Sequence, residues 1–311
     1  MEYRNLGHTG LKVSRISLGG WLNMGRQPEQ TPMKRVLRLA YDRGINHFDL
    51  ADSYANGEAE KAFGAHVLGI KRESLVIASK VALPVGDGPN DRGLSRKHIT
   101  ESLSNTLRNI GTDYLDVYYC HREDSSTPLE ETLLTMNDLI KQGKIHYWGT
   151  SLWSPKSLKK VHRMARKWGL HPPRVEQPPY NLLNRWVERK IVPLTARLGM
   201  GLAVWSPLAG GALTGKYNEN IPPETRGGST DLVDQYLKPK PLQQIRIFCD
   251  KAHQLGHAPA PLALAWLLHQ KGVTTVITGA SHPSQLEQNL SALDISLSPQ
   301  TLRALRRCFD H

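Results

Sequence analysis

Short apolar segments alternate with helix-like segments about eight times along this 311-residue chain. Alternation of this kind builds right-handed βαβ units around a parallel sheet. Eight units at this chain length favour a closed (β/α)8 barrel, the TIM-barrel fold, over an open doubly wound sheet. We expect strands at residues 16–18, 45–50, 75–79, 115–120, 144–149, 174–176, 201–205 and 273–277.

Capping signals mark where the helices begin and end. Ser95 precedes a strongly periodic segment as an N-cap, and Gly111 follows its end. A Gly-containing turn near residue 10 predicts a short N-terminal β-hairpin from residues 3–6 and 11–13. We expect barrel helices at residues 31–43, 58–69, 95–110, 128–142, 155–168, 186–198, 243–255 and 261–270, and extra C-terminal helices at 282–292 and 299–309.

The remaining segments bear on domain organisation. Residues 206–238 are rich in Gly, Pro and polar residues, so we expect an irregular segment there. Neither a linker nor an internal repeat is evident in the sequence. We therefore expect residues 1–311 to form a single domain.

Composition limits the location and the partners of the protein. Three cysteines cannot form a disulfide framework, which favours a reducing cytosol. The N-terminal segment lacks an apolar signal core, and no run of about 18 apolar residues is available to span a membrane. We therefore expect a soluble, cytoplasmic protein that does not enter a membrane.

The formal charge of +12 has two interpretations that stay open. The simpler one is a basic, solvated surface, and the sharper one is a field that attracts a polyanionic ligand. Nucleic acid is a disfavoured partner, because the Lys and Arg residues are spread along the chain without a nucleic-acid-binding signature.

Reactive side chains stand where three consecutive predicted strands end. Asp49 and Tyr54 follow one strand, Lys80 ends the next, and His121 follows the one after. In a (β/α)8 barrel the carboxyl ends of the strands form the rim that holds the active site. Taken singly, these residues could be a helix cap, a packing ring, a surface charge and a rim histidine. Their shared placement favours one common site.

The four side chains form a coherent proton-transfer set. Free tyrosine has a pKa of about 10, and a neighbouring lysine cation favours the phenolate and lowers that pKa. A buried Lys80 would need a counter-charge, which Asp49 could supply. His121 could hydrogen-bond a carbonyl oxygen. The set predicts proton delivery to an oxygen that becomes an alkoxide, with a hydride supplied by a cofactor.

The sequence resembles the aldo-keto reductase superfamily over nearly its whole length. Within the superfamily it is similar to the branch that holds potassium-channel β-subunits and bacterial glyceraldehyde-3-phosphate reductases, and YNLLNRW points more to the reductases. The motifs that carry the resemblance, in family order, are GINHFDLADSY (44–54), the strand end at Lys80, YYCHRED (118–124), GKIHYWGTS (143–151), EQPPYNLLNRW (176–186), WSPLAGGALTGKY (205–217) and TGASHPSQLEQN (278–289).

The resemblance implies a catalytic tetrad of Asp49, Tyr54, Lys80 and His121, with Tyr54 as the general acid. Channel β-subunits often carry asparagine at the position of His121, so the histidine implies an oxidoreductase that reduces aldehydes or ketones to alcohols. A cofactor-binding, redox-sensing regulatory subunit is the alternative. The implied substrates are small reactive aldehydes, including glyceraldehyde phosphate or methylglyoxal, and a homo-oligomer is left open.

The resemblance also implies a nicotinamide cofactor across the rim. Lys216, Arg226 and Ser281 could together receive a 2′-phosphate, so NADPH is favoured over NADH. The residues implied to contact the cofactor are Gly20, Trp21, Asp49, Ser151, Gln177, Trp205, Ser206, Pro207, Leu208, Lys216, Arg226, Gly279, Ser281, Gln285, Gln288 and Asn289.

A few residues depart from the family pattern or suggest other chemistry. Leu152 stands where many relatives have Asn or Arg, and Gln288 stands where an acidic residue is common. Residues 210–216 match most of a P-loop, but position 217 is Tyr and not Ser or Thr, which disfavours an NTPase. HRED (121–124) fits no zinc-ligand spacing, so no metal is expected. We expect Asp52 to be a loop or cap group and Cys120 a buried strand residue.

Overall fold

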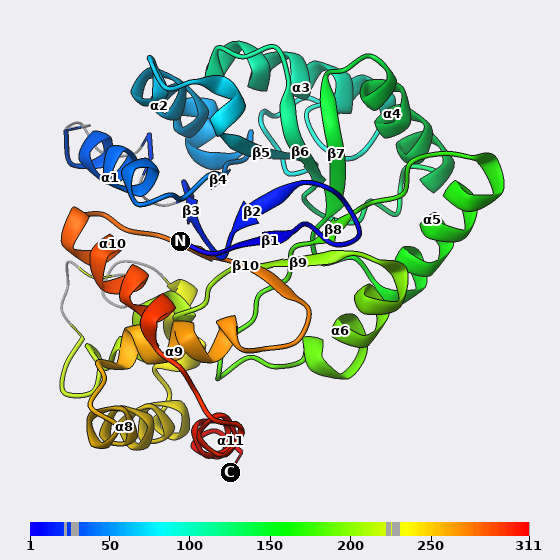
Figure 1. Ribbon diagram of the computed structural model, residues 1–311. Helices are drawn as coiled ribbons and strands as arrows, with labels where there is room; N and C mark the ends of the chain where they lie inside the picture. Colours follow the sequence, from blue (N-terminus) through cyan, green and yellow to red (C-terminus); the bar gives the residue numbers. More distant parts are fainter. Residues whose placement is uncertain (22–23, 26–30, 222–224, 226–230, 311) are drawn as a thin grey trace.

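The computed structural model describes residues 1–21, 24–25, 31–221, 225 and 231–310. Eight parallel strands close into a barrel in the order β10-β3-β4-β5-β6-β7-β8-β9, which confirms the predicted (β/α)8 fold (Figure 1). The strands are β3 (Ile16–Gly19), β4 (His47–Asp49), β5 (Val76–Val81), β6 (Leu115–Cys120), β7 (Ile145–Thr150), β8 (Val175–Glu176), β9 (Gly201–Val204) and β10 (Val273–Thr278).

Helices surround the barrel and cover its outer surface (Figure 1). The expected caps are present: the Ser95 side chain accepts a hydrogen bond from the backbone N–H of His98, and Gly111 ends that helix with a left-handed φ of 76°. The helices are α1 (Thr31–Asp42), α2 (Glu58–Val67), α3 (Arg96–Ile110), α4 (Leu129–Lys141), α5 (Pro155–Trp168), α6 (Val187–Leu198), α8 (Pro239–Gln254), α9 (Pro259–Leu268), α10 (Pro283–Leu290) and α11 (Pro299–Arg307).

The N-terminal hairpin closes the amino end of the barrel. It pairs β1 (Tyr3–Asn5) with β2 (Lys12–Ser14), and both strands cross in front of the barrel in Figure 1. Leu6 and Val13 are fully buried and pack among the inward-facing barrel residues. The backbone N–H of His8 donates to the carbonyl of Gly199, which fixes the hairpin beside the start of β9. The hairpin therefore covers the end of the barrel opposite to the carboxyl rim.

The structure differs from the prediction in the C-terminal half. Helix α8 begins at Pro239 and not at residue 243. Pro239 and Pro241 lack a backbone N–H, and the first helical turn tolerates this because those N–H groups have no intrahelical partner. The segment predicted to be irregular also contains 3-10 helices, η3 (Ala209–Thr214) and η4 (Asp231–Tyr236).

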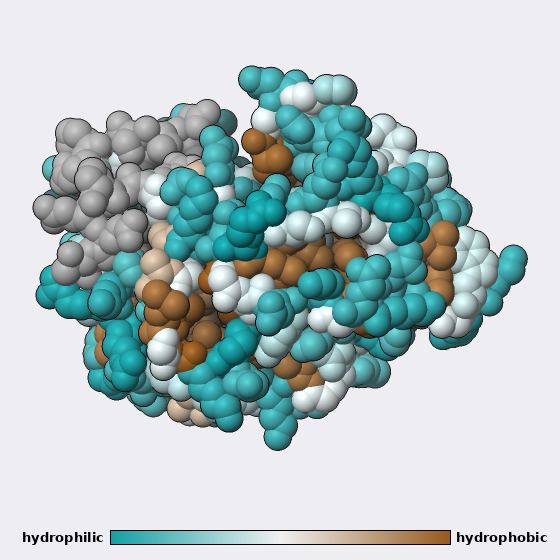
Figure 2. Space-filling model, turned by 90° about the horizontal axis from the view of Figure 1, so that it is seen from above, coloured by the Kyte–Doolittle hydropathy of each residue, from teal (hydrophilic) through white to brown (hydrophobic). Residues whose placement is uncertain are grey.

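Figure 2 shows one face on which hydrophilic side chains dominate and apolar residues gather in small areas between them. Within the part of the chain that the structure describes, no helix is both long enough and apolar enough to cross a membrane.

Candidate active site

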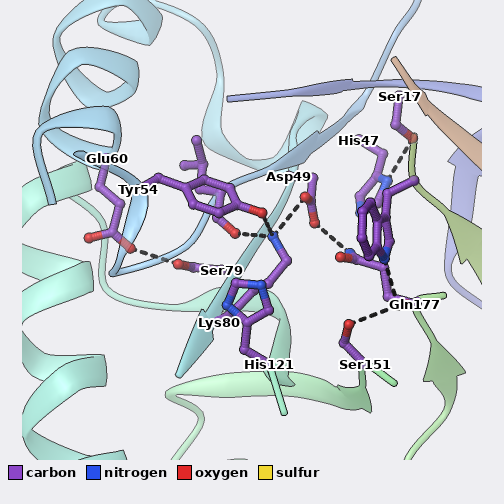
Figure 3. Close-up of polar contacts among 12 residues, drawn as sticks. Ser17, His47, Asp49, Tyr54, Glu60, Ser79, Lys80, His121, Ser151 and Gln177 are labelled. Atoms are coloured by element: carbon purple, nitrogen blue, oxygen red, sulfur yellow. Dashed lines mark hydrogen bonds and ion pairs between the residues drawn. The ribbon is translucent and has the colours of Figure 1, made fainter. Parts of the chain in front are cut away.

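The four predicted catalytic residues lie at one rim of the barrel, on neighbouring elements. Asp49 is the last residue of β4, Lys80 is the penultimate residue of β5, and His121 directly follows β6. Tyr54 begins the 3-10 helix η1 (Tyr54–Gly57) just beyond β4. Adjacent parallel strands carry these residues to the same edge, as Figure 3 shows.

Lys80 is the centre of the group. Its side chain is 0% exposed, and its ammonium donates to Asp49 Oδ2 at 2.7 Å, to the Leu50 carbonyl at 2.6 Å and to the Tyr54 hydroxyl at 2.9 Å. An ammonium group has three N–H donors, so each has a partner. The ion pair with Asp49 supplies the counter-charge that a buried cation requires.

The electrostatics of Lys80 and Tyr54 set their protonation states. Burial acts to lower the pKa of Lys80, but Asp49 and Tyr54 together outweigh it and the pKa is raised, so the amine is a cation. Burial raises the pKa of Tyr54, and the Lys80 charge offsets this only in part. The expectation of a lowered tyrosine pKa is therefore wrong for the resting protein. Tyr54 is a neutral phenol at neutral pH, which is the form that can donate a proton.

His121 faces the Tyr54 ring edge-on, with 5.9 Å between the ring centroids and an interplanar angle of 77°. Burial, with the nearby Lys80 and Arg122 charges, lowers the pKa of His121 to about 2. The imidazole is therefore neutral. Its buried Nδ1 has no hydrogen-bond partner among the described residues.

A second group of predicted residues joins this cluster through Gln177. The Gln177 side-chain amide donates to Asp49 Oδ1 at 2.7 Å. Its backbone carbonyl accepts from the Ser151 hydroxyl at 2.8 Å and from Trp205 Nε1 at 3.2 Å. Ser151 and Gln177 follow β7 and β8 and lie near Asp49 (Figure 3). The hydrogen bond of Trp205, which follows β9, brings its ring to the same group.

Gly20 and Trp21 complete the rim next to β3. The backbone N–H of Gly20 donates to the Asp49 carbonyl at 2.9 Å. A Cβ atom at position 20 would lie 2.8 Å from Leu50 Cδ2 and 2.9 Å from Met24 Sδ, so the close approach requires glycine. The Trp21 ring lies 6.4 Å from the Tyr54 ring, between centroids, so this indole is near the reactive phenol.

The segment after β9 leaves the rim as a series of tight turns. Ser206 has a left-handed φ of 50°, and the Asn181 side chain donates to its carbonyl at 2.9 Å. Pro207 is buried and Leu208 partly buried. Gly210 and Gly211 also have positive φ within η3, so this segment does not form the loop-to-helix geometry of a P-loop.

The predicted adenosine-end residues lie around the start of α10. The Ser281 backbone N–H and hydroxyl both donate to Gln285 Oε1 at 3.0 Å, and Asn289 Nδ2 donates to the Gly279 carbonyl at 3.5 Å. Gln288 is exposed. Lys216 is exposed. Both Lys216 and Ser281 lie in the described part of the chain, and no hydrogen bond joins them there. Arg226, predicted near the phosphates, lies outside the described residues.

The sequence analysis did not predict that several acidic side chains are buried. Asp52, expected as a loop or cap group, is buried, accepts from the Ser102 hydroxyl at 2.7 Å, and has its pKa raised to about 7 by burial. Glu60 accepts from Ser79 at 2.6 Å and from Thr106 at 2.8 Å. The sequence does contain a signal for the burial of Glu60. Glu60 stands three residues before the buried Phe63, and residues at that spacing lie on the same face of a helix.

Glu176 is a further buried acid, at the end of β8. It is fully buried and accepts a hydrogen bond from the Thr150 hydroxyl at the end of β7. Burial raises its pKa to about 7. Glu176 therefore links the two strands that carry Ser151 and Gln177. Cys120 is fully buried in β6, as expected.

Comparison with known proteins agrees with this architecture. The model of the Aldo/keto reductase family matches residues 15–310. Proteins named "Probable voltage-gated potassium channel subunit beta" from Oryza sativa subsp. japonica and from Arabidopsis thaliana are each 43% identical over 302 residues, which cover 95% of this chain and 92% of theirs.

A protein from Schizosaccharomyces pombe named "Putative voltage-gated potassium channel subunit beta" is 43% identical over 319 residues, covering 98% of this chain and 92% of its own. These relatives confirm the branch that the sequence motifs indicated. With the family match and the closed barrel, they show that the chain belongs to the Aldo/keto reductase family, whose members are oxidoreductases.

Proposed function

We propose that this protein is an NADPH-dependent carbonyl reductase that converts aldehydes or ketones to alcohols. The observation that carries the proposal is the hydrogen bond between the Lys80 ammonium and the Tyr54 hydroxyl, in a buried group that Asp49 neutralises. A structural lysine would not need a phenol as its third partner, since water or a backbone carbonyl would serve. The arrangement suits a phenol that must give up its proton during a reaction.

The chain's own residues account for the proton half of the reduction. Tyr54 is the general acid, and its O–H proton passes to the carbonyl oxygen as the C=O double bond becomes a C–O single bond. The phenolate left behind is stabilised by Lys80 at 2.9 Å and then recovers a proton from solvent. Neutral His121 donates one ring N–H to the carbonyl oxygen and orients it toward Tyr54. General acid catalysis of this kind contributes about 10² to 10⁴ in rate.

The rim residues fit a nicotinamide cofactor. Ser151 and Gln177 place a hydroxyl and an amide beside Asp49, a donor and acceptor set that matches a carboxamide, and Trp205 adds a flat ring at the same place. When bound, the cofactor supplies the hydride that becomes the C–H bond of the alcohol.

The remaining predicted contacts would hold the phosphate and adenosine parts. Lys216 is an exposed cation and Ser281 lies at the start of α10, where anions are favoured, which supports NADPH over NADH. The full proposed set is Gly20, Trp21, Asp49, Ser151, Gln177, Trp205, Ser206, Pro207, Leu208, Lys216, Arg226, Gly279, Ser281, Gln285, Gln288 and Asn289.

Tyr54→Phe tests the proposal. We expect carbonyl reduction to fall by about 10² to 10⁴, because only the acidic hydroxyl is removed. The Kd for NADPH, measured by calorimetry, should stay within a few-fold of the wild-type value. Tyr114→Phe is the matched control, because the Tyr114 ring packs under Arg72, away from the rim residues. Undiminished turnover in Tyr54→Phe would reject Tyr54 as the general acid.

A second candidate is a redox-sensing regulatory subunit. It is favoured by the names of the three relatives, which describe voltage-gated potassium channel β-subunits. Steady-state NADPH oxidation with a panel of aldehydes separates the two candidates. Turnover well above the buffer rate supports the reductase, whereas NADPH binding without turnover of any aldehyde supports the regulatory subunit.

A further inference from the structure

Glu176 is a fully buried acid at the end of β8, one residue before Gln177. Val175, which precedes it, packs among the inward-facing residues of the barrel. Because side chains alternate across a strand, Glu176 faces outward, under the surrounding helices, and Gln177 faces inward again, toward Asp49. Burying a carboxyl group is costly, and it raises the pKa of Glu176 to about 7. An apolar side chain would fill this position at a lower cost, so the contacts of the carboxyl group have to explain it.

The carboxyl group of Glu176 joins β8 to β7. It accepts a hydrogen bond from the Thr150 hydroxyl, and the strand register places the two residues side by side. On the inward face the next residue of each strand makes a matching link, from the Ser151 hydroxyl to the Gln177 carbonyl at 2.8 Å (Figure 3). The two strand ends are therefore joined on both faces, and the outward link uses no residue of the proposed cofactor set.

The turn that follows β7 is strained, and Glu176 faces it. Leu152 has a left-handed φ of 57°, a conformation that persists in a non-glycine residue only where the surrounding structure holds it. The backbone N–H groups of Leu152 and Trp153 lower the pKa of the Glu176 carboxyl, as hydrogen-bond donors do. These contacts are looser than the bond from the hydroxyl group, since Oε1 has no partner within hydrogen-bond geometry among the described residues. Glu123 accepts from the Ser154 backbone N–H at 3.0 Å, so carboxylates flank the turn at both ends.

We infer that Glu176 is a positioning residue, which together with Thr150 fixes the strand ends that present Ser151 and Gln177 to the nicotinamide carboxamide. Glu176 acts from the outward face, through the residues on the inward face. A carboxamide is recognised by hydrogen bonds that weaken steeply with distance and angle, so its partners have to be held in place. The inference rests on the proposed cofactor site, and its test measures binding and not turnover.

The test compares two ligands that differ only in the nicotinamide group. NADP⁺ carries it, and 2′-phospho-ADP-ribose lacks it but keeps the pyrophosphate and adenosine parts. Calorimetry gives a Kd for each ligand, and the ratio of the two values reports recognition of the nicotinamide group alone. We expect wild type to bind NADP⁺ more tightly. In Thr150→Val and in Glu176→Met this preference should fall about 10-fold, the loss of one or two hydrogen bonds, while the Kd for 2′-phospho-ADP-ribose stays near the wild-type value.

Conservative and matched variants separate positioning from stability. Glu176→Gln keeps a carbonyl oxygen for the Thr150 hydroxyl, so it should retain most of the preference for NADP⁺. Thr150→Val keeps the shape of the side chain and decides the test if Glu176→Met does not fold. Asp116→Asn is the matched control: Asp116 is a buried acid near the amino end of β6 and pairs with Arg72 at 2.8 Å. This control should lower the unfolding free energy and leave the preference unchanged.

The remaining outcomes distinguish this inference from the proposed reductase. An unchanged preference in both Thr150→Val and Glu176→Met would overturn the role of Glu176, and so would an equal fall in Asp116→Asn. Wild-type reduction of aldehydes together with an unchanged preference in the variants would reject Glu176 and keep the reductase. A reduced preference in the variants, with no aldehyde reduced by wild type, would do the reverse. Equal binding of the two ligands to wild type would reject the nicotinamide site at Ser151 and Gln177, and this inference with it.

Discussion

The Lys80 ammonium donates a hydrogen bond to the Tyr54 hydroxyl at 2.9 Å. Because the other two lysine N–H groups go to Asp49 and to the Leu50 carbonyl, the Tyr54 oxygen must act as the acceptor in this contact. The phenolic hydrogen is therefore left for a different partner. The His121 ring stands beside the phenol, 5.9 Å from the Tyr54 ring between centroids. The tyrosine is therefore free to donate its hydrogen to a substrate oxygen.

Replacing Lys80 tests this relationship. In Lys80→Met the Tyr54 phenolate would form without a neighbouring cation, so we expect kcat for carbonyl reduction to fall about 10² to 10⁴. The same change leaves the buried Asp49 carboxylate without its cation, which costs about 3 to 5 kcal/mol of unfolding free energy. Steady-state kinetics and urea denaturation measure the two effects separately.

Two controls separate charge from packing in that experiment. Lys61→Met removes an exposed lysine that pairs with Glu58, and it should change neither kinetics nor stability appreciably. The double variant Asp49→Asn/Lys80→Met should recover part of the lost stability, since no unpaired charge remains buried. A double variant as unstable as Lys80→Met would show that the loss comes from packing and not from Asp49.

The pH dependence of reduction follows from the protonation states of His121 and Tyr54. With its pKa lowered to about 2, His121 is neutral throughout the working range and contributes no titration near pH 6.5. Tyr54, with a raised pKa, remains protonated. We expect log kcat to show no histidine step between pH 5 and about 9, and to fall only at higher pH as Tyr54 loses its proton.

His121→Asn provides the comparison for the pH profile. It should lower kcat, because the carbonyl oxygen loses its imidazole donor, and it should leave the shape of the profile unchanged. A unit slope below pH 6.5 that disappears in His121→Asn would contradict a neutral histidine.

The contact between Asp49 and Lys80 could be predicted from the sequence. Both residues end strands that are consecutive in a βαβ pattern, and parallel neighbours deliver their carboxyl ends to one edge. The strand register pairs Asp49 with Ala78, which puts Lys80 two residues further along and on the same face. The same logic placed His121 at this rim, whereas Ser151 and Gln177 were expected in the site from the family resemblance.

The protonation of Tyr54 and the role of Asp52 could not be predicted in this way. The direction of the Tyr54 pKa shift depends on how completely neighbouring chain segments exclude water, and burial outweighs the Lys80 charge. Asp52 lies in the loop after β4, where no strand period fixes the side chain, and it turns inward to Ser102 on α3. Packing between distant segments decides both properties.

Asp52 should make stability depend on pH. Its pKa is raised to about 7 from an ordinary value of 3.8, so the folded state binds this proton more tightly than the unfolded state. The stabilisation of the folded state by protonated Asp52 is full below pH 3.8 and is lost as the pH rises through 7. Asp52→Asn removes the titration and can still accept from Ser102. The unfolding free energy of the variant should therefore rise relative to that of wild type between pH 5 and 8, by at most about 4 kcal/mol.

Urea denaturation at pH 5 and at pH 8 measures this difference. The comparison between the two proteins cancels the titrations that they share, including those of His47, His162 and Glu176. A difference in unfolding free energy that stays constant across this range would show that Asp52 is ionised in the folded protein at both pH values.

Leu152 carries backbone strain next to Ser151. Its φ of 57° lies in the left-handed region, where a Leu side chain crowds its own backbone at a cost of about 1 to 2 kcal/mol. Asparagine tolerates this conformation better, so Leu152→Asn should stabilise the protein by about 0.5 to 1 kcal/mol. Leu68→Asn is the matched control: Leu68 is 82% exposed but has a φ of −53°, so the same substitution should bring no gain. Equal changes in unfolding free energy for the two variants, measured in urea, would show that any effect at position 152 comes from exchanging an apolar side chain for an amide and not from relief of strain.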